Sequence, residues 1–140
     1  MHVRDIMITD VVSCSVAEPL QTAVGKMLDA GVGSVIVTRE GNPTGIVTET
    51  DVLWEGYDTG RCFENISVEE AMSHPLVTIA PDRTVQSASR KMIDDGIKKL
   101  AVVDGLDLVG IITLTDLVSH EDDLLDQAHR EEAQRLDWEL

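Results

Sequence analysis

The sequence predicts an α/β fold made of two tandem copies of one unit, each a βαββα-like repeat. Shifted by 65 residues, the chain aligns with itself without a gap, and residues 3–53 match residues 68–118 at fifteen of fifty-one positions. A register held over such a length indicates an internal repeat. Each copy also combines an amphipathic helical stripe with short β-branched runs, and this combination indicates a small sheet covered by helices.

The size and composition of the chain favour one shared, aliphatic core. Each copy has only about 50 residues, close to the lower limit for a unit that folds alone, because small units bury too little surface. The hydrophobic fraction is 43%, and only four residues are aromatic. No apolar run reaches the roughly 18 residues that a membrane span needs, and no signal segment opens the chain. Cys14 and Cys62 stand far apart, which indicates neither a disulfide framework nor a zinc site, and we expect a cytoplasmic protein.

The charge of the chain argues against nucleic acid and membrane partners. The formal net charge is −15, with 26 acidic residues and only four lysines. Phosphate contacts need a basic surface, so neither nucleic acid nor an anionic membrane is an expected partner. The acidity fits a protein of a salt-rich cytoplasm, and it fits an ordinary acidic protein equally well.

Repeat 1, residues 1–56, is predicted to contain a helix, two strands and a second helix. The apolar residues at helical spacing are Leu20, Ala23, Val24, Met27 and Leu28. Gly31 can end this helix in the left-handed conformation, and the β-branched run 35–37 follows as a buried strand. Residues 41–43 have turn chemistry, the next strand begins at Ile46, and a helix follows near Asp51.

Repeat 2, residues 67–118, is predicted to have the same order of elements. Its helical stripe consists of Val85, Ala88, Met92 and Ile93. Gly96 ends this helix, strands at 100–103 and 108–112 flank a turn, and a final helix begins at about Thr115.

The remaining segments connect and flank these elements. A short leading helix, 3–7 or 68–72, opens each repeat. The extended pieces expected before the main helices are 11–15 and 76–79. Residues 57–66 have no clear period and are predicted to be a linker. Residues 119–140 are highly charged and lack Gly and Pro, so we expect one acidic C-terminal helix.

The sharpest signal is one motif that both repeats carry. Gly45-Ile-Val-Thr48-Glu-Thr50-Asp51 recurs as Gly110-Ile-Ile-Thr113-Leu-Thr115-Asp116. Threonine with an acid three residues later, at the start of a helix, is a capping box. A short carboxylate in this place can also accept hydrogen bonds from the two hydroxyls of a ribose, and a helix N-terminus favours anions. Two explanations therefore stay open, a cap alone or a site for ribose and phosphate.

Further patterns extend the similarity of the two halves through residues 1–118. They are the leading segments Val-Arg-Asp-Ile-Met and Val-Glu-Glu-Ala-Met, the helix end Met-x-x-x-Gly, and the strands Val-Ile-Val and Leu-Ala-Val-Val-Asp. With Gly-h-h-Thr-x-x-Asp, where h is apolar, they resemble a pair of CBS domains, the tandem unit named after cystathionine β-synthase and also called a Bateman module. The resemblance implies two clefts related by a pseudo-twofold axis, which in this family commonly bind adenosine-containing ligands.

The resemblance also implies which residues would hold such a ligand. Asp51 and Asp116 would bind the ribose hydroxyls. The residues expected to flank the ribose or phosphate are Thr48, Thr50, Thr113 and Thr115. Each cleft would also borrow from the other repeat, with Thr9, Val11 and Val12 boxing an adenine over Asp116, and Ser73 and Val77 doing so over Asp51. The strand starts that would complete the walls are Val32 and Ser34 in repeat 1, and Ile97, Lys98 and Lys99 in repeat 2.

Lys98 and Lys99 distinguish the two repeats. They fall where related modules place basic residues facing phosphate, whereas their counterparts in repeat 1, Gly33 and Ser34, carry no charge. Two adjacent lysines in an acidic chain suit a local phosphate site, and they also suit exposed charges at a strand edge. On the first interpretation, the two clefts are unequal.

Two functions follow from the resemblance. The first is a regulatory, non-enzymatic module that senses AMP, ADP or ATP, or S-adenosylmethionine, and shifts its arrangement for an unknown partner protein. The second is a scaffold that dimerises and presents the acidic C-terminal helix without a ligand. No catalytic constellation and no metal-ligand spacing is evident, so we expect no catalytic residue, no metal and no required cofactor. A homodimer is expected in either case, because closed twofold dimers are the commonest assembly.

Overall fold

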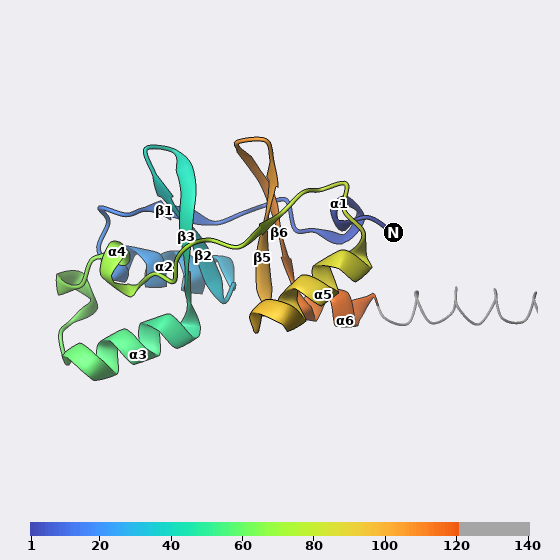
Figure 1. Ribbon diagram of the computed structural model, residues 1–140. Coiled ribbons are helices and arrows are strands. Elements are labelled where there is room, and N and C mark those ends of the chain that lie inside the picture. The colour runs from blue at the N-terminus through green and yellow to red at the C-terminus, as the bar shows by residue number, and fades with distance from the viewer. Residues whose placement is uncertain (121–140) are drawn as a thin grey trace, which may run out of the picture.

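The computed structural model describes residues 1–120 of the chain. Two three-stranded sheets, each accompanied by its own helices, stand side by side (Figure 1). This arrangement confirms the predicted α/β class and the two repeats. The helix predicted at 119–140 lies, beyond His120, outside the described residues.

The first sheet has the strand order β1-β2-β3. Its strands are β1 (Ser13–Ser15), β2 (Ser34–Arg39) and β3 (Asn42–Thr48), and its helices are α2 (Leu20–Ala30) and α3 (Glu49–Thr59). Strand β1 pairs with β2 in parallel, and β2 pairs with β3 in antiparallel fashion. The left-handed backbone of Gly31, with φ 66°, ends α2 as the sequence predicts.

The second sheet repeats this topology at an offset of 65 residues. Its strands are β4 (Thr78–Ile79), β5 (Lys99–Asp104) and β6 (Asp107–Thr113), and its helices are α5 (Val85–Asp95) and α6 (Leu114–Ser119). The pairing is again parallel and then antiparallel. Even the register irregularity recurs, between Val37 and Thr38 in β2 and between Val102 and Val103 in β5.

One sequence-based boundary is wrong, and the structure adds detail to another segment. Strand β3 begins at Asn42 and not at Ile46, because the turn is made by Glu40 and Gly41, which both have positive φ. The segment 57–66, predicted to be the linker, contains the end of α3, which continues to Thr59, and a 3-10 helix, η1 (Phe63–Asn65). Periodicity misses these pieces because they are short and bury little apolar surface.

Two residues assigned to the apolar helical stripes are not buried. Leu28 of α2 is 77% exposed, and its equivalent Ile93 of α5 is 76% exposed. The residues that α2 does bury are Leu20, Ala23 and Met27. The two exposed side chains therefore lie at the edge of each stripe and face away from the sheets.

The two leading helices exchange partners between the repeats. Helix α1 (Val3–Ile6) packs into the core of the second sheet, and helix α4 (Val68–Ala71) packs into the core of the first. The backbone follows, because Val3 N donates to Arg83 O at 2.8 Å and Val68 N donates to Glu18 O at 2.9 Å. Each core is thus completed by the other repeat, and neither repeat holds a whole core alone.

Gly45 and Gly110 allow the exchanged segments to approach the sheets closely. A Cβ at Gly45 would lie 2.8 Å from Met72 Sδ, and a Cβ at Gly110 would lie 2.7 Å from Met7 Sδ. Real side-chain carbons do not tolerate such distances. The glycine that opens each copy of the shared motif is therefore explained by packing across the repeats.

The cysteines and the character of the helices can be described within residues 1–120. Cys14 and Cys62 are both unpaired thiols, and burial raises the pKa of the Cys14 thiol to about 11. Across the same residues, none of the helices combines the length and the apolar character that crossing a bilayer requires.

Candidate functional site

Two clefts lie where the exchanged segments meet the strand ends. The first, here named the Thr50 cleft, has a volume of about 440 Å³. Its lining consists of Gly33, Ile46, Thr48, Glu49, Thr50, Ser73, Pro75, Leu76, Val77, Gly96, Ile97, Lys98 and Lys99. Residues of both repeats therefore form this cleft.

The second, here named the Asp116 cleft, has a volume of about 420 Å³. Its lining consists of Ile8, Asp10, Val11, Val12, Gly31, Val32, Gly33, Ser34, Lys99, Ile111, Thr113, Thr115 and Asp116. Most of these positions are the 65-residue equivalents of positions in the Thr50 cleft, as a pseudo-twofold relationship requires.

The structure brings most of the sequence-predicted site residues into these two linings. Of the predicted residues, only Thr9 and Asp51 are not in either lining. Thr9 lies in the segment between two residues that do line the Asp116 cleft, Ile8 and Asp10. The expected borrowing between repeats is present as geometry, while the ligand role of the residues stays a prediction.

Both Thr-x-x-Asp pairs form complete capping boxes. Thr48 Oγ1 accepts a hydrogen bond from Asp51 N at 3.2 Å, and Asp51 Oδ2 accepts one from Thr48 N at 2.9 Å. The pair Thr113 and Asp116 makes the same two bonds at 3.1 and 2.8 Å. The capping explanation is therefore confirmed, and it uses only one oxygen of each carboxylate.

The second carboxylate oxygen differs between the two motifs. Asp51 Oδ1 accepts a 2.9 Å hydrogen bond from Ser73 Oγ. At the position equivalent to Ser73 the chain has Ile8, which has no hydroxyl to donate. Within residues 1–120, Asp116 Oδ1 accepts no hydrogen bond, and Asp116 lines its cleft whereas Asp51 does not.

The two lysines also differ in position. Lys98 is exposed and lines only the Thr50 cleft, whereas Lys99 is half-buried at the start of β5 and lines both clefts. Burial lowers the pKa of the Lys99 ammonium, and the nearby Glu49 carboxylate opposes part of this effect. A half-buried cation is less well hydrated than an exposed one, which strengthens its attraction for an anion.

Sequence reasoning missed two acidic residues in the linings. Glu49 lines the Thr50 cleft, and Asp10 lines the Asp116 cleft. Glu49 occupies a variable position of the shared motif, where repeat 2 has Leu114. This difference between the repeats was a usable signal, but only the fold shows that Glu49 lies beside Lys99.

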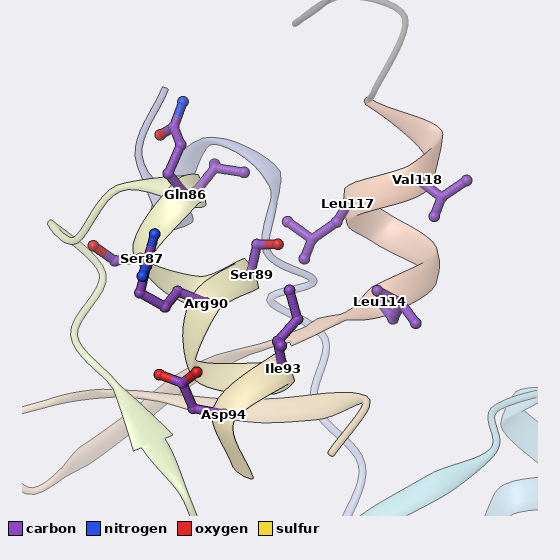
Figure 2. Close-up of a pocket in the computed structure, with 10 residues that line it drawn as sticks. Gln86, Ser87, Ser89, Arg90, Ile93, Asp94, Leu114, Leu117 and Val118 are labelled. Atoms are coloured by element: carbon purple, nitrogen blue, oxygen red, sulfur yellow. The ribbon is translucent and has the colours of Figure 1, made fainter. Parts of the chain in front are cut away.

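A larger groove lies outside the two clefts, between α5 and α6 (Figure 2). Its volume is about 670 Å³. Ile93 of α5 and Leu114, Leu117 and Val118 of α6 give it an apolar wall, and Arg90 and Asp94 lie on α5 beside it (Figure 2). Leu114, the first residue of α6, is the one residue of the shared motif that lines this groove, so the groove belongs to a different surface from the two clefts.

Metal ligands are not grouped in the part of the chain that the structure describes. No cluster of three or more His, Cys, Asp or Glu side chains with metal-binding geometry occurs in residues 1–120. Of the acidic residues that line the clefts, Glu49 and Asp116 lie in the first turns of α3 and α6, and Asp10 lies between α1 and β1.

Comparison with known proteins agrees with this architecture. The CBS domain family matches residues 3–57 and 68–123. The chain is 33% identical over 119 residues to the CBS domain-containing protein YhcV of Bacillus subtilis, which covers 85% of this chain and 84% of YhcV. It is 32% identical over 123 residues to a protein of Methanopyrus kandleri, covering 86% of this chain and 63% of that relative. The chain thus spans less than two thirds of the Methanopyrus protein.

Solved structures show the same fold. A conserved protein from Pyrococcus horikoshii matches with a TM-score of 0.78 at 26% identity, covering 86% of this chain and 91% of that chain. A hexameric CBS-CP12 protein from bloom-forming cyanobacteria matches with a TM-score of 0.78 at 27% identity, covering 97% of this chain and 82% of that chain. The chain therefore belongs to the CBS-domain family, as a tandem pair of these regulatory modules.

Proposed function

We propose that the protein is a non-enzymatic regulatory module that binds an adenine nucleotide, AMP, ADP or ATP, in the clefts between its repeats. The observation that carries the proposal is the Asp116 cleft, where an unpaired carboxylate oxygen, two threonines and an apolar wall meet beside a lysine. These are the groups that a ribose, an adenine and a phosphate need together.

The nucleoside end of the ligand fits the wall of the Asp116 cleft. Val11, Val12 and Val32 form an apolar surface on which an adenine ring can lie. Asp116 Oδ1 accepts no hydrogen bond within the described residues and can accept one from a ribose hydroxyl. A charge-assisted hydrogen bond of this kind is about twice as strong as one between neutral groups.

The phosphate end of the ligand fits the two lysines. Lys98 and Lys99 lie beside the Thr50 cleft, and Lys99 also reaches the Asp116 cleft. In a chain with a net charge of −15, a nucleotide phosphate needs such a local cationic site, because the surrounding field repels it. The number of phosphates then decides affinity, which separates AMP from ADP and ATP.

S-adenosylmethionine is a second candidate ligand, because it shares the adenosine part but carries no phosphate. The acidic residues Asp10 and Glu49 would favour its positive charge. A ligand-independent scaffold is the alternative function, and it leaves the unpaired oxygen of Asp116 and the position of Lys99 without a role.

The module is proposed to act as a homodimer, joined through exposed apolar helix faces. Leu28, Leu53, Trp54 and Tyr57 are exposed on α2 and α3, and Ile93 and Val118 are exposed on α5 and α6. Helices α3, α5 and α6 lie along the lower side of the molecule, away from the hairpin turns (Figure 1). Large exposed apolar side chains of this kind are suited to an association surface, and the CBS-CP12 relative is a hexamer.

Calorimetric titration of the protein with AMP, ADP, ATP and S-adenosylmethionine tests the proposed ligand. We expect one or more nucleotides to bind, and Asp116→Asn to weaken the binding in the Asp116 cleft about tenfold or more, since a hydrogen bond to a charged group contributes roughly 1.5–3 kcal/mol. Asparagine still offers an oxygen to Thr113 N, so the helix cap is kept.

Asp107→Asn is the matched control, because Asp107 is exposed at the start of β6 and lines neither cleft. Binding that is equally strong in Asp116→Asn and in the unmodified protein would remove the ribose assignment. If no nucleotide produces heat or raises the melting temperature, as binding must by mass action, the scaffold function is favoured.

A further inference from the structure

Lys99 lies on the boundary between the two clefts. Among residues 1–120, Gly33 and Lys99 are the two residues that line both of them. Lys98 lines only the Thr50 cleft. Lys99 is therefore the single charged side chain, within this part of the chain, that both clefts share.

The Lys99 ammonium lies close to Gly33. A Cβ at Gly33 would lie 3.2 Å from Lys99 Nζ and 3.1 Å from Glu49 Oε1. The absence of a side chain at position 33 thus leaves room for the ammonium to lie over the backbone of repeat 1. From there it can turn toward either cleft by rotation about its own side-chain bonds.

The Lys99 ammonium is not engaged elsewhere in the described residues. Lys26 Nζ donates to Ser13 O at 2.7 Å, and Lys91 Nζ donates to Thr78 O at 2.6 Å. Lys99 makes no comparable hydrogen bond and no ion pair within residues 1–120. Its half-buried position and the lowered pKa of its ammonium agree with a cation that lacks a full set of partners.

We propose that the two clefts compete for Lys99, so that a phosphate-bearing ligand in one cleft weakens the binding of a second such ligand in the other. This inference rests on the proposed function, that the clefts bind nucleotides. Once a phosphate has drawn Lys99 to one side, the other cleft faces an added negative charge without its shared cation.

The competition also sets the order of filling. The Thr50 cleft is lined by two lysines, Lys98 and Lys99, and by one acid, Glu49. The Asp116 cleft is lined by one lysine, Lys99, and by two acids, Asp10 and Asp116. A ligand with two or more phosphates therefore occupies the Thr50 cleft first. By thermodynamic linkage, a ligand in either cleft weakens binding in the other cleft by the same factor. A typical coupling between two sites changes the affinity at least about fivefold.

Titration of single-cleft variants with ADP tests this coupling. Thr50→Trp and Thr115→Trp form a matched pair, because both threonines are exposed, occupy equivalent positions and line different clefts. Each tryptophan fills one cleft and leaves the other to be measured alone. We expect the second ADP to bind the unmodified protein at least fivefold more weakly than it binds the weaker cleft alone.

Lys99→Met and adenosine supply the controls for charge. Methionine keeps the length of the side chain without its ammonium, and adenosine keeps the nucleoside without a phosphate. In Lys99→Met, the second ADP should bind with the same affinity that the weaker cleft shows when it is measured alone. For adenosine, these two affinities should already be equal without the Lys99→Met substitution. If a tryptophan variant fails to fold, Thr50→Leu and Thr115→Leu, which carry smaller side chains at the same two positions, supply the single-cleft affinities instead.

The outcomes separate the two proposals. The competition is overturned if ADP binds both clefts of the unmodified protein with the affinities measured in the single-cleft variants. It is also overturned if ADP binds only one of the two single-cleft variants. In both cases nucleotide binding itself stands. If neither ADP nor adenosine binds the unmodified protein, the proposed function fails, and the competition for Lys99 fails with it.

Discussion

The Ser73 hydroxyl donates a 2.9 Å hydrogen bond to Asp51 Oδ1, and this contact makes the two motifs chemically unequal. The equivalent partner of Asp116 is Ile8, which cannot donate. The capping bond occupies the other oxygen in both motifs. Both oxygens of Asp51 therefore accept hydrogen bonds within the protein, whereas among the described residues Asp116 keeps Oδ1 for a ligand.

We expect Ser73→Ala to strengthen adenosine binding in the Thr50 cleft, because it releases an oxygen of Asp51. A hydrogen bond contributes a net 0.5–1.5 kcal/mol, so the gain should be roughly fivefold. Titration of Ser73→Ala in the Thr115→Trp background measures it. Ile8→Ser is the reciprocal variant and should weaken binding in the Asp116 cleft, and unchanged affinities in both variants would contradict the role of this contact.

We expect Gly45→Ala and Gly110→Ala to destabilise the fold, each by roughly 1–3 kcal/mol, as overpacking does. The added Cβ at Gly45 would lie 2.9 Å from Ser73 O, and that at Gly110 would lie 3.0 Å from Ile8 O. These are backbone atoms that cannot move aside cheaply. Urea unfolding measures the change.

Gly25→Ala is the control for the glycine substitutions. Gly25 lies inside α2, and nothing lies within 4 Å of an added Cβ. Alanine should stabilise this helix by about 0.5–1 kcal/mol. A loss of stability at Gly25 equal to that at Gly45 would contradict the explanation that the motif begins with glycine because the exchanged segments pack against it.

We expect Lys99→Met to raise the free energy of unfolding of the empty protein at neutral pH. Burial lowers the pKa of Lys99, so the unfolded chain binds its proton more tightly than the folded protein, and the charged form is disfavoured in the fold. As the pH rises through the folded pKa, Lys99 loses its charge and this penalty disappears. The gain from methionine should therefore shrink toward alkaline pH.

Urea unfolding of both proteins between neutral and alkaline pH checks this dependence. Lys98→Met is the control, because Lys98 is exposed and its replacement should have little effect on stability. If Lys99→Met raises the free energy of unfolding by the same amount across this pH range, then packing of the methionine, and not removal of the charge, causes the increase.

We expect Trp54→Ser and Ile93→Ser to weaken self-association about tenfold or more, since buried aromatic and large aliphatic side chains dominate interfaces. Trp54 is 61% exposed, and its ring lies edge-on to Tyr57 with centroids 6.4 Å apart. Sedimentation at several protein concentrations measures the assembly. Leu106→Ser is the control, because Leu106 is exposed on the opposite hairpin, and equal effects of all three variants would contradict this surface.

Much of the site was predictable from the repeat itself. The offset of 65 residues places Thr48 and Thr113, and Lys99 and Ser34, in equivalent positions, and all four line the clefts. The capping boxes follow from neighbours only three residues apart. Such local patterns depend only on residues that are close together in the chain, and these residues can be read from the sequence.

The boundaries of short elements were less predictable. Helix α3 runs three residues beyond the expected start of the linker and buries only Val52. Leu28 and Ile93 fit the helical period but stay exposed, because position on a helix face does not tell whether another element covers it. Apolar periodicity predicts an element only where the element buries its face within the same chain.

The sequence by itself determined that the protein has two equivalent halves and that their charged residues differ at Lys98 and Lys99. Only the tertiary structure decided that α1 and α4 exchange cores, that Ser73 reaches Asp51, and that Lys99 is shared by both clefts. The physical reason is that these contacts join segments of different repeats. Periodicity and motif spacing report neighbours along the chain, whereas the shared position of Lys99 exists only once β5 is packed beside Gly33.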